Sequence, residues 1–463
     1  MFPLLILLIN PFLLKEFTPI KYEISKNIDY KLPLKQNNIL KKINGFYGQI
    51  GPNPKYYDDN YHLFDGNGMI HGIFFDNGNI TYHNHMIRTD KYYLENFIKD
   101  KSPLSLGNID NKKFAFLFIF YRFFELLKMI PNFLGTANTA LWINNKKIYA
   151  LHERDYPYEI NIDYNLKSIN TIKKKYLNKI KYFTAHPKDD GNNIYAISYN
   201  TYLPEATLIK YNKNLTMLNH INIKTKYSGM IHDIAVSDNY IIFCDIPYQF
   251  NLTQTLNNKL PYYFDRNKNN WFTIISKDYK TIYRVELNES FFIFHYDNVS
   301  EDDDNIYFYA IIHENFEMDM LTKSIKKIEN NCKYRKFIIN KKNWTIKIEK
   351  NEIFEKINVE YPVRKDNITL LSILGNDLDI IGFIITNGFK IKSRILLKNR
   401  KVYGEPSLIK IDNEYFILCF VYDNLYNNYL YCGNINGNKN IEIKLDLKIN
   451  KGFHSIFIEK YDL

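Results

Sequence analysis

Four histidines, each in its own distinctive local sequence, are the residues of this chain best suited to metal chemistry. They are His186 in Thr184-A-H-P-K, His232 in Met230-I-H-D, His295 in Phe294-H-Y-D-N and His454 in Gly452-F-H-S. Zinc fingers and helical metalloprotease motifs place their ligands within a few residues of one another, and these four lie far apart in the chain. Imidazole-rich sites suit iron, zinc, copper or nickel, so the histidines alone leave the metal open.

Dispersed ligands can meet only on a scaffold that directs several strand ends toward one point. A propeller, which arranges repeated sheets around a shared axis, is such a scaffold. Short apolar runs recur in this chain without alternating helices, which indicates an all-β fold. The runs that we expect to be strands are 194–199, 240–245, 281–286, 306–312, 344–349, 379–385 and 414–422. Between such runs, pairs of hairpin-forming residues predict tight turns at Asn77-Gly78, Asn387-Gly388 and Asn436-Gly437.

Composition is typical of a large globular protein and excludes some partners. The 463 residues are 46% hydrophobic and 24% charged, which can form a substantial core. The net charge of +11 is spread along the chain, and no helix-turn-helix, RNP or zinc-knuckle pattern is present. We therefore expect no nucleic-acid partner, whereas a diffuse positive surface would favour anionic lipid. The four cysteines form no C-x-x-C pair, which predicts buried free thiols.

Two apolar segments could contact a membrane. Residues 1–14 are almost wholly apolar but too short to cross a bilayer as a helix, so segment 1–20 is expected to be an interfacial anchor or an atypical signal. We expect residues 21–463 to form a single domain. Within it, residues 114–130 carry Arg122, Glu125 and Lys128 at every third position. This spacing predicts an amphipathic helix with a wide apolar face, which either packs on the core or contacts lipid.

The order of several local motifs resembles that of the carotenoid cleavage oxygenase family. The matching stretches are Gly45-F-Y-G-Q-I-G-P-N-P, Phe64-D-G-N-G-M-I-H-G, Ala137-N-T-A-L-W through Ala150-L-H-E, Met230-I-H-D-I-A-V and Gly404-E-P. They run in the family's order from about Gly45 to Phe457, and each of the four histidines stands at one of its ligand positions. The resemblance implies a seven-bladed β-propeller with a helical and loop cap over an iron site at the axis. It also implies that the helix near 114–130 contacts one membrane leaflet.

The same resemblance implies a particular set of metal-site residues. His186, His232, His295 and His454 would bind one Fe(II) per chain, and glutamates would accept the second N–H of three of these imidazoles. Glu153 and Glu405 match two of the family's three glutamates. The third belongs to an E-F-P-R-I-N-like string, and aligning its I-N here leaves Glu352 as the candidate through a register shift. Otherwise His295 or His454 would lack a carboxylate partner.

The implied activity is cleavage of a carbon–carbon double bond by an Fe(II)-dependent dioxygenase. The substrate would be a carotenoid, an apocarotenoid or a stilbene-like conjugated alkene, the second substrate O2, and the products two carbonyl compounds. One alternative keeps the same iron site and acts as a retinoid isomerohydrolase. Another, from a different class, is a catalytically silent lipid-binding propeller. The resemblance also implies an intracellular, peripheral membrane protein, while the oligomeric state stays open.

Overall fold

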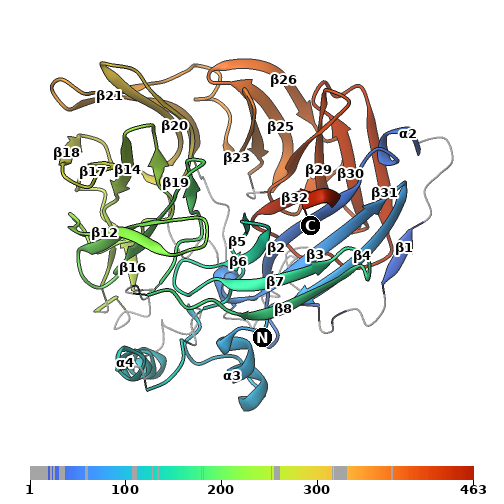
Figure 1. Cartoon of the computed structure of the whole chain (residues 1–463), viewed down its shortest axis with the longest axis horizontal. Coiled ribbons are helices and arrows are strands. Elements are labelled where there is room, and N and C mark those ends of the chain that lie inside the picture. Colours follow the sequence, from blue (N-terminus) through green and yellow to red (C-terminus); the bar gives the residue numbers. More distant parts are fainter. Residues whose placement is uncertain are drawn as a thin grey trace, which may run out of the picture.

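The computed structural model describes most of the chain. The described residues are 19–20, 23, 27–30, 37–57, 61–106, 112–127, 129–132, 135–178, 180, 182–251, 253–254, 261–314, 316, 331–376 and 379–462. The expected apolar anchor at residues 1–14 lies outside them. Within the described residues the chain is nearly all β, and antiparallel sheets are arranged around a common centre (Figure 1). The expectation of an all-β, propeller-type fold is thereby confirmed.

Four four-stranded sheets follow one another along the middle of the chain. The first contains β5 (Ala140–Asn144), β6 (Lys147–Leu151), β7 (Tyr158–Asp163) and β8 (Ser168–Lys174). The second contains β9 (Lys188–Asp189), β10 (Ile194–Tyr199), β11 (Glu205–Tyr211) and β12 (Met217–Lys224). The third contains β13 (Ala235–Val236), β14 (Tyr240–Asp245), β17 (Asn270–Ser276) and β18 (Ile282–Leu287), and the fourth contains β19 (Phe292–Glu301), β20 (Asn305–His313), β21 (Cys332–Asn340) and β22 (Thr345–Glu349). A separate hairpin pairs β15 (Tyr248–Phe250) with β16 (Tyr262–Phe264).

A nine-stranded sheet follows and consists of two four-stranded halves joined through β27 (Lys401–Val402). The first half contains β23 (Val359–Lys365), β24 (Ile368–Leu374), β25 (Ile380–Asn387) and β26 (Lys390–Leu396). The second half contains β28 (Ser407–Ile411), β29 (Glu414–Tyr422), β30 (Asn428–Asn434) and β31 (Asn440–Leu445). Counting each half as one blade is consistent with the seven blades that the resemblance implies.

The ring is closed by a sheet that combines the two ends of the described chain. It contains β1 (Ile28–Tyr30), β4 (Asn79–Met86), β3 (Asn67–Asp76), β2 (Gly45–Asn53) and β32 (Ser455–Glu459), in that order. β2 pairs antiparallel with β32 from Gly45 to Gln49. Strands that face the centre contact one another in the order β13, β19, β23, β28, β32 and β5 (Figure 1). This pairing of distant segments lets one closed ring present many strand ends to a single axis.

The strand and turn predictions are confirmed in detail. Each of the seven expected runs overlaps a strand of the structure, with ends that differ by at most two residues. The Asn77-Gly78 pair joins β3 to β4, and both residues adopt positive φ values of 50° and 88°, as a type I′ hairpin turn requires. The four cysteines are buried and free. Apolar side chains of neighbouring sheets form the core; for example, Phe272 of β17 contacts both Phe308 and Phe337 of the next sheet.

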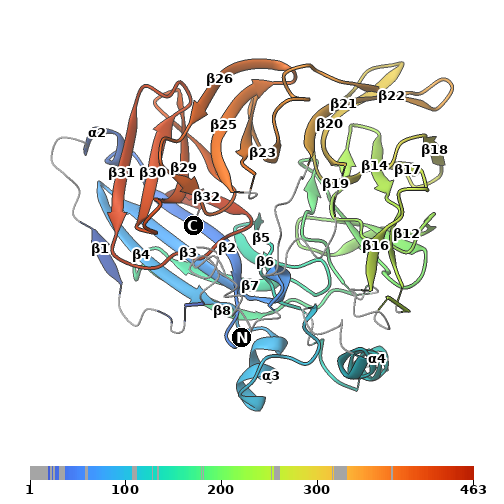
Figure 2. The ribbon, with the colours of Figure 1, turned by 180° about the vertical axis from the view of Figure 1, so that it is seen from behind.

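The helices of the described residues are few and lie outside the ring of sheets. They are α2 (Asn37–Leu40), α3 (Asp90–Ile98) and α4 (Lys112–Leu126), with short 3-10 segments at Leu63–Asp65 and Lys460–Asp462. The α3 helix is capped by Thr89, whose hydroxyl accepts from the Tyr92 N–H at 3.0 Å. Figures 1 and 2 show α3 and α4 at the same edge of the ring. None of the described helices combines the length and apolar character needed to cross a bilayer.

Helix α4 (Lys112–Leu126) covers most of the expected segment 114–130, and the exposure of its side chains shows how it is oriented. Arg122 is only 6% exposed and forms a buried ion pair with Glu125, so these two charged residues face the protein. The apolar side chains that point outward are Phe116, Ile119, Phe120, Phe123 and Leu126, each at least 48% exposed. A helix packed on the core would show the opposite arrangement.

Candidate metal centre

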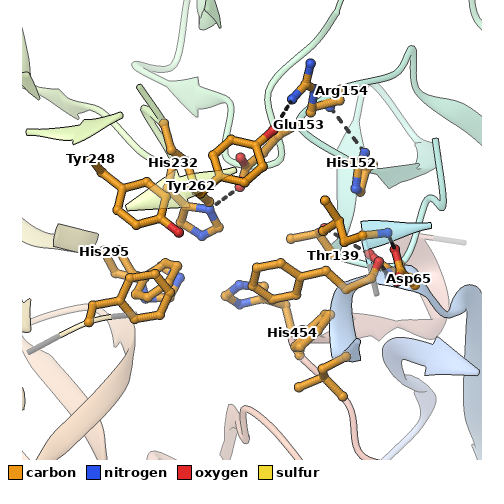
Figure 3. A pocket seen from close by; sticks show the side chains of 18 of the residues that line it. Asp65, Thr139, His152, Glu153, Arg154, His232, Tyr248, Tyr262, His295 and His454 are labelled. Carbon is orange, nitrogen blue, oxygen red and sulfur yellow. Dashed lines mark hydrogen bonds and ion pairs between the residues drawn. The ribbon is translucent and has the colours of Figure 1, made fainter. Parts of the chain in front are cut away.

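Four histidines lie where the innermost strands of four sheets begin. His186, His232 and His454 precede β9, β13 and β32 by one to three residues, and His295 lies within β19. Each of these strands is the edge strand of its sheet. Because the inner edges of the sheets surround the axis, side chains at these positions are directed at one another, and Figure 3 shows three of them pointing into a common cavity.

The four imidazoles converge on one point, as predicted from their local sequences. One ring nitrogen of each lies within 4.8 Å of the corresponding atoms of the others. The Nε2 atoms of His186 and His232 are 3.0 Å apart, which is the separation of two ligands at about 2.1 Å from an ion and about 90° apart. The Nε2 of His295 is buried with no hydrogen-bond partner among the described residues. A nitrogen lone pair left in this state fits a metal ligand.

Three of the imidazoles are oriented by a carboxylate on their other nitrogen. The Nδ1 of His232 contacts Glu153, the Nδ1 of His295 contacts Glu360 Oε1 at 2.8 Å, and the Nδ1 of His454 contacts Glu405 Oε1 at 3.1 Å. A carboxylate at Nδ1 holds the ring in one tautomer, leaves Nε2 as the free donor and makes it more basic. Glu153 and Glu405 therefore lie where the resemblance places them.

The expectation for Glu352 is wrong, because Glu360 occupies the third position. Glu352 is exposed in the turn that precedes β23, whereas Glu360 is 5% exposed at the start of that strand. Sequence alignment on Ile357-Asn358 caused the error. The triplet Glu360-Tyr361-Pro362 keeps the glutamate–aromatic–proline order of the family string, and alignment on that triplet would have identified the residue.

His313 is a further buried residue of the site that sequence reasoning grouped with ordinary histidines. Its Nε2 lies 3.3 Å from Glu360 Oε1, and its Nδ1 lies 3.3 Å from Cys332 Sγ. Burial acts to raise the pKa of Glu360, but contacts from His295 and His313 outweigh it and lower the pKa to about 2. Glu360 therefore remains a carboxylate acceptor for His295 throughout the neutral range. No distinctive local sequence marks His313.

His186 has no carboxylate contact among the described residues, and its segment is held by an ion pair of the nearby Lys188 side chain instead. Asp233 forms an ion pair with Lys188 at 2.8 Å and accepts from the Tyr296 N–H at 3.2 Å. One carboxylate thus joins the segments that carry His186, His232 and His295. Burial, together with the three neighbouring imidazoles, lowers the pKa of His186 well below its usual value, which favours the neutral form that binds a metal.

The segment of His454 is positioned by close backbone approach. A side chain at Gly452 would meet Gln49 at 2.2 Å, and one at Gly404 would meet the backbone of Gly452 at 2.8 Å. The Ile50 N–H donates to the His454 carbonyl at 3.0 Å, and the Glu405 N–H donates to the Phe453 carbonyl at 2.9 Å. The stretches 45–54 and 404–406 contain none of the four histidines, but through these contacts they position the segment that carries His454.

A cavity of about 240 Å³ adjoins the histidines. Its wall includes His232, His295 and His454 and is otherwise largely apolar and aromatic. The apolar and aromatic residues of the wall are Leu63, Phe64, Leu104, Leu106, Tyr199, Met230, Tyr248, Tyr262, Phe294, Phe316, Tyr361, Leu374 and Phe453. A cavity of this kind excludes water and accepts a hydrocarbon, and the converging imidazole nitrogens stand at its wall.

Fold and site together define a propeller with a cluster of four histidines at its axis, an arrangement that could hold a metal ion. The family model described as "Retinal pigment epithelial membrane protein" matches residues 17–372. The chain belongs to this family, which includes the carotenoid cleavage dioxygenases. It is 29% identical over 364 residues to a carotenoid 9,10(9′,10′)-cleavage dioxygenase of Crocus sativus, covering 74% of this chain and 65% of that one. It is 31% identical over 328 residues to carotenoid 9,10(9′,10′)-cleavage dioxygenase 1 of Pisum sativum, covering 68% of this chain and 59% of that one.

Solved structures show the same fold. A lignostilbene dioxygenase of Pseudomonas brassicacearum superimposes with a TM-score of 0.76 at 15% identity, over 96% of both chains. A Synechocystis apocarotenoid oxygenase variant superimposes with a TM-score of 0.77 at 17% identity, over 97% of this chain and 99% of that one. The match to the curated plant relatives spans less than two thirds of their length.

Proposed function

We propose that this protein is an Fe(II)-dependent dioxygenase that cleaves a carbon–carbon double bond of a carotenoid, an apocarotenoid or a related conjugated alkene. The observation that carries the proposal is the convergence of four imidazole nitrogens, three of them held by glutamates, on the wall of an apolar cavity. Membership of the family supports the same conclusion. The four histidines, with Glu153, Glu360 and Glu405 behind them, are the proposed metal site.

The chemistry consumes one O2 and one alkene. Both bonds of the carbon–carbon double bond and the O–O bond break, and two C=O bonds form, so the products are two carbonyl compounds. Fe(II), when bound, would supply a centre for dioxygen activation with ligand positions left open by four neutral imidazoles. The three glutamates hold their imidazoles in the binding tautomer. Phe294 and Phe453, which are adjacent to His295 and His454 and line the cavity, would hold the alkene and exclude water.

We also propose that the edge of the ring formed by α3 and α4 contacts a membrane surface. Phe97 of α3 is 87% exposed, and Phe116 and Phe123 of α4 are 69% and 57% exposed. Contiguous exposed apolar side chains of this kind mark interaction surfaces, and an interfacial helix binds through its apolar area and through basic groups attracted to anionic lipid. The apolar segment 1–14 would add to this contact. A polyene dissolved in one leaflet would then reach the cavity without crossing water.

The activity can be tested on protein loaded with Fe(II). The loaded protein is incubated with a panel of carotenoids, apocarotenoids and stilbenes under ¹⁸O2, and the products are identified by mass spectrometry. We expect two aldehyde or ketone products per alkene, labelled from O2, and no product from the His232→Ala variant. Turnover of a retinyl ester without O2 would instead identify an isomerohydrolase. Folded protein that binds no iron and forms no product would identify a lipid-binding module.

A further inference from the structure

An arginine lies in the wall of the cavity next to the metal site. Arg154 directly follows Glu153, is partly buried, and lines the cavity. Its Nη1 donates to the Tyr262 hydroxyl at 3.2 Å and its Nη2 to the Tyr202 hydroxyl at 3.4 Å. Figure 3 shows Arg154 joined to Tyr262, whose ring lies beside His232. The guanidinium is therefore held by neutral tyrosines in a largely apolar cavity.

Arg154 has no carboxylate partner within the described residues. The acidic residues next to it in the chain are committed elsewhere. Glu153 contacts His232 and accepts from Tyr199 at 2.5 Å, and Asp155 forms an ion pair with Lys174 at 2.7 Å. A charge in a cavity of low polarity is costly unless an opposite charge compensates it. Arg154 supplies a positive charge at this point of the wall, and an anionic group of a ligand could compensate it.

A second arginine lies beside the same tyrosines and has a carboxylate partner. Arg122 of α4 stacks near the same two aromatic rings as Arg154, with its guanidinium carbon 5.7 Å from the centres of Tyr182 and Tyr202. The corresponding distances for Arg154 are 5.8 and 5.6 Å. Arg122 is neutralised by its ion pair with Glu125. Two guanidinium groups thus share two tyrosines and one carboxylate.

We propose that Arg154, with the hydroxyls of Tyr202 and Tyr262, binds a carboxylate at one end of the substrate. The substrate class is then a polyene carboxylic acid, an apocarotenoic acid, whose hydrocarbon part occupies the apolar cavity beside the histidines. A guanidinium binds a carboxylate through two parallel N–H donors, and each tyrosine that accepts from Arg154 still has its own proton to donate. This inference deepens the proposed dioxygenase function and rests on it for the identity of the reaction.

The position of Arg154 agrees with entry from a membrane. Through Tyr182 and Tyr202 it is connected to Arg122 of α4, so the proposed carboxylate subsite lies on the side of the cavity toward that helix. An amphiphilic polyene in a leaflet keeps its carboxylate at the interface and its hydrocarbon in the lipid. Such a molecule would enter hydrocarbon first, and its charged end would remain on the α4 side.

The test compares an acid with its ester on the full-length protein. All-trans-retinoic acid and its methyl ester are titrated in the same detergent, and binding is followed by quenching of tyrosine and tryptophan fluorescence. We expect wild-type protein to bind the acid at least about tenfold more tightly than the ester, as expected for a hydrogen-bonded charge pair. Arg154→Met should reduce this ratio to about one while leaving ester affinity unchanged, and Arg154→Lys should keep part of the preference.

A matched control and a second readout keep the two proposals separate. Lys451 also lines the cavity but is paired with Asp379 at 3.6 Å, so Lys451→Met should retain the preference for the acid. Equal binding of acid and ester by wild type, or an unchanged ratio in folded Arg154→Met, would overturn the inference. Acid preference without any cleavage product under O2 would preserve the inference and contradict the dioxygenase proposal. Cleavage of other alkenes without a preference for the acid would support the dioxygenase proposal and contradict the carboxylate subsite.

Discussion

The axis of the ring and the α4 edge both bury paired charged groups. They differ in their apolar side chains, which are buried at the axis and exposed on α4. At the axis, Glu360 holds His295 at 2.8 Å, and both are buried with the apolar side chains behind them. In α4, the Arg122–Glu125 pair is likewise turned inward, but Phe116 and its apolar neighbours face outward. Paired charges inside a protein are ordinary, whereas an apolar helix face in water is not.

The difference indicates that the two regions would bind different partners. At the axis, His295 Nε2 has no hydrogen-bond partner among the described residues, and the proposed metal ion would bind such a nitrogen. The α4 edge exposes apolar side chains that no described residue covers, and lipid would cover them if the proposed membrane contact exists. Loss of a group at the axis should therefore change metal binding and leave membrane binding intact, and changes at the edge should do the opposite.

The largest effect is expected from removal of one imidazole. His232→Ala should lower iron affinity by more than about 100-fold, since even loss of an outer hydrogen-bond partner costs about 10–100-fold. Iron content after dialysis against a weak chelator measures this, with about one iron per chain expected for wild type. His220→Ala, in the outer strand β12, is the matched control and should keep full iron content. Normal iron in His232→Ala would contradict the proposed metal site.

The next largest effect is expected from Glu360 and not from Glu352. Glu360→Gln should lower iron affinity or turnover by about 10–100-fold, because a neutral amide replaces the charged acceptor of His295 Nδ1. Glu153→Gln and Glu405→Gln should have the same effect through His232 and His454. Glu352→Gln should match wild type, since that side chain is exposed. Isothermal titration with Fe(II) under anaerobic conditions measures all four variants, and equal losses for Glu352 and Glu360 would contradict the corrected assignment.

At the α4 edge, the triple substitution of Phe116, Phe120 and Phe123 with Ser should release the protein from membranes. These rings are 69%, 50% and 57% exposed, so the folded state loses little. Each buried aromatic ring contributes on the order of 1–2 kcal/mol to an interface. Sedimentation with anionic liposomes measures the change, and iron content should stay at the wild-type level. If the triple variant stays bound while deletion of residues 1–14 frees it, the N-terminal segment alone is the anchor.

The smallest effect tests whether α3 shares the membrane surface. Phe97→Ser removes one ring that is 87% exposed and should lower liposome partitioning several-fold, equivalent to about 1 kcal/mol. Leu425→Ser is the matched control, since Leu425 is 79% exposed in the turn between β29 and β30, away from both helices. Equal loss in both variants would mean that partitioning follows general hydrophobicity rather than this edge.

Much of the metal site was predictable from local sequence. The four histidines, Glu153 and Glu405 each stand in a short stretch whose residue types have a structural reason, such as Gly452, where any side chain would meet Gln49. Strand periodicity and Asn-Gly turns likewise predicted the all-β fold, because alternation and turn chemistry are local properties. The prediction of Glu352 was wrong, because the sequence was aligned on Ile357-Asn358 and not on the Glu360-Tyr361-Pro362 triplet.

The sequence by itself determined which residues could bind a metal and that α4 would be amphipathic. Only the tertiary structure decided which face of α4 is exposed, because periodicity is the same whether the charged arc faces water or protein. Tertiary structure also decided the partners of His313 and Arg154, whose contacts come from β21, β23, β16 and the segment after β10. Contacts between distant strands depend on ring closure, and no local pattern records them.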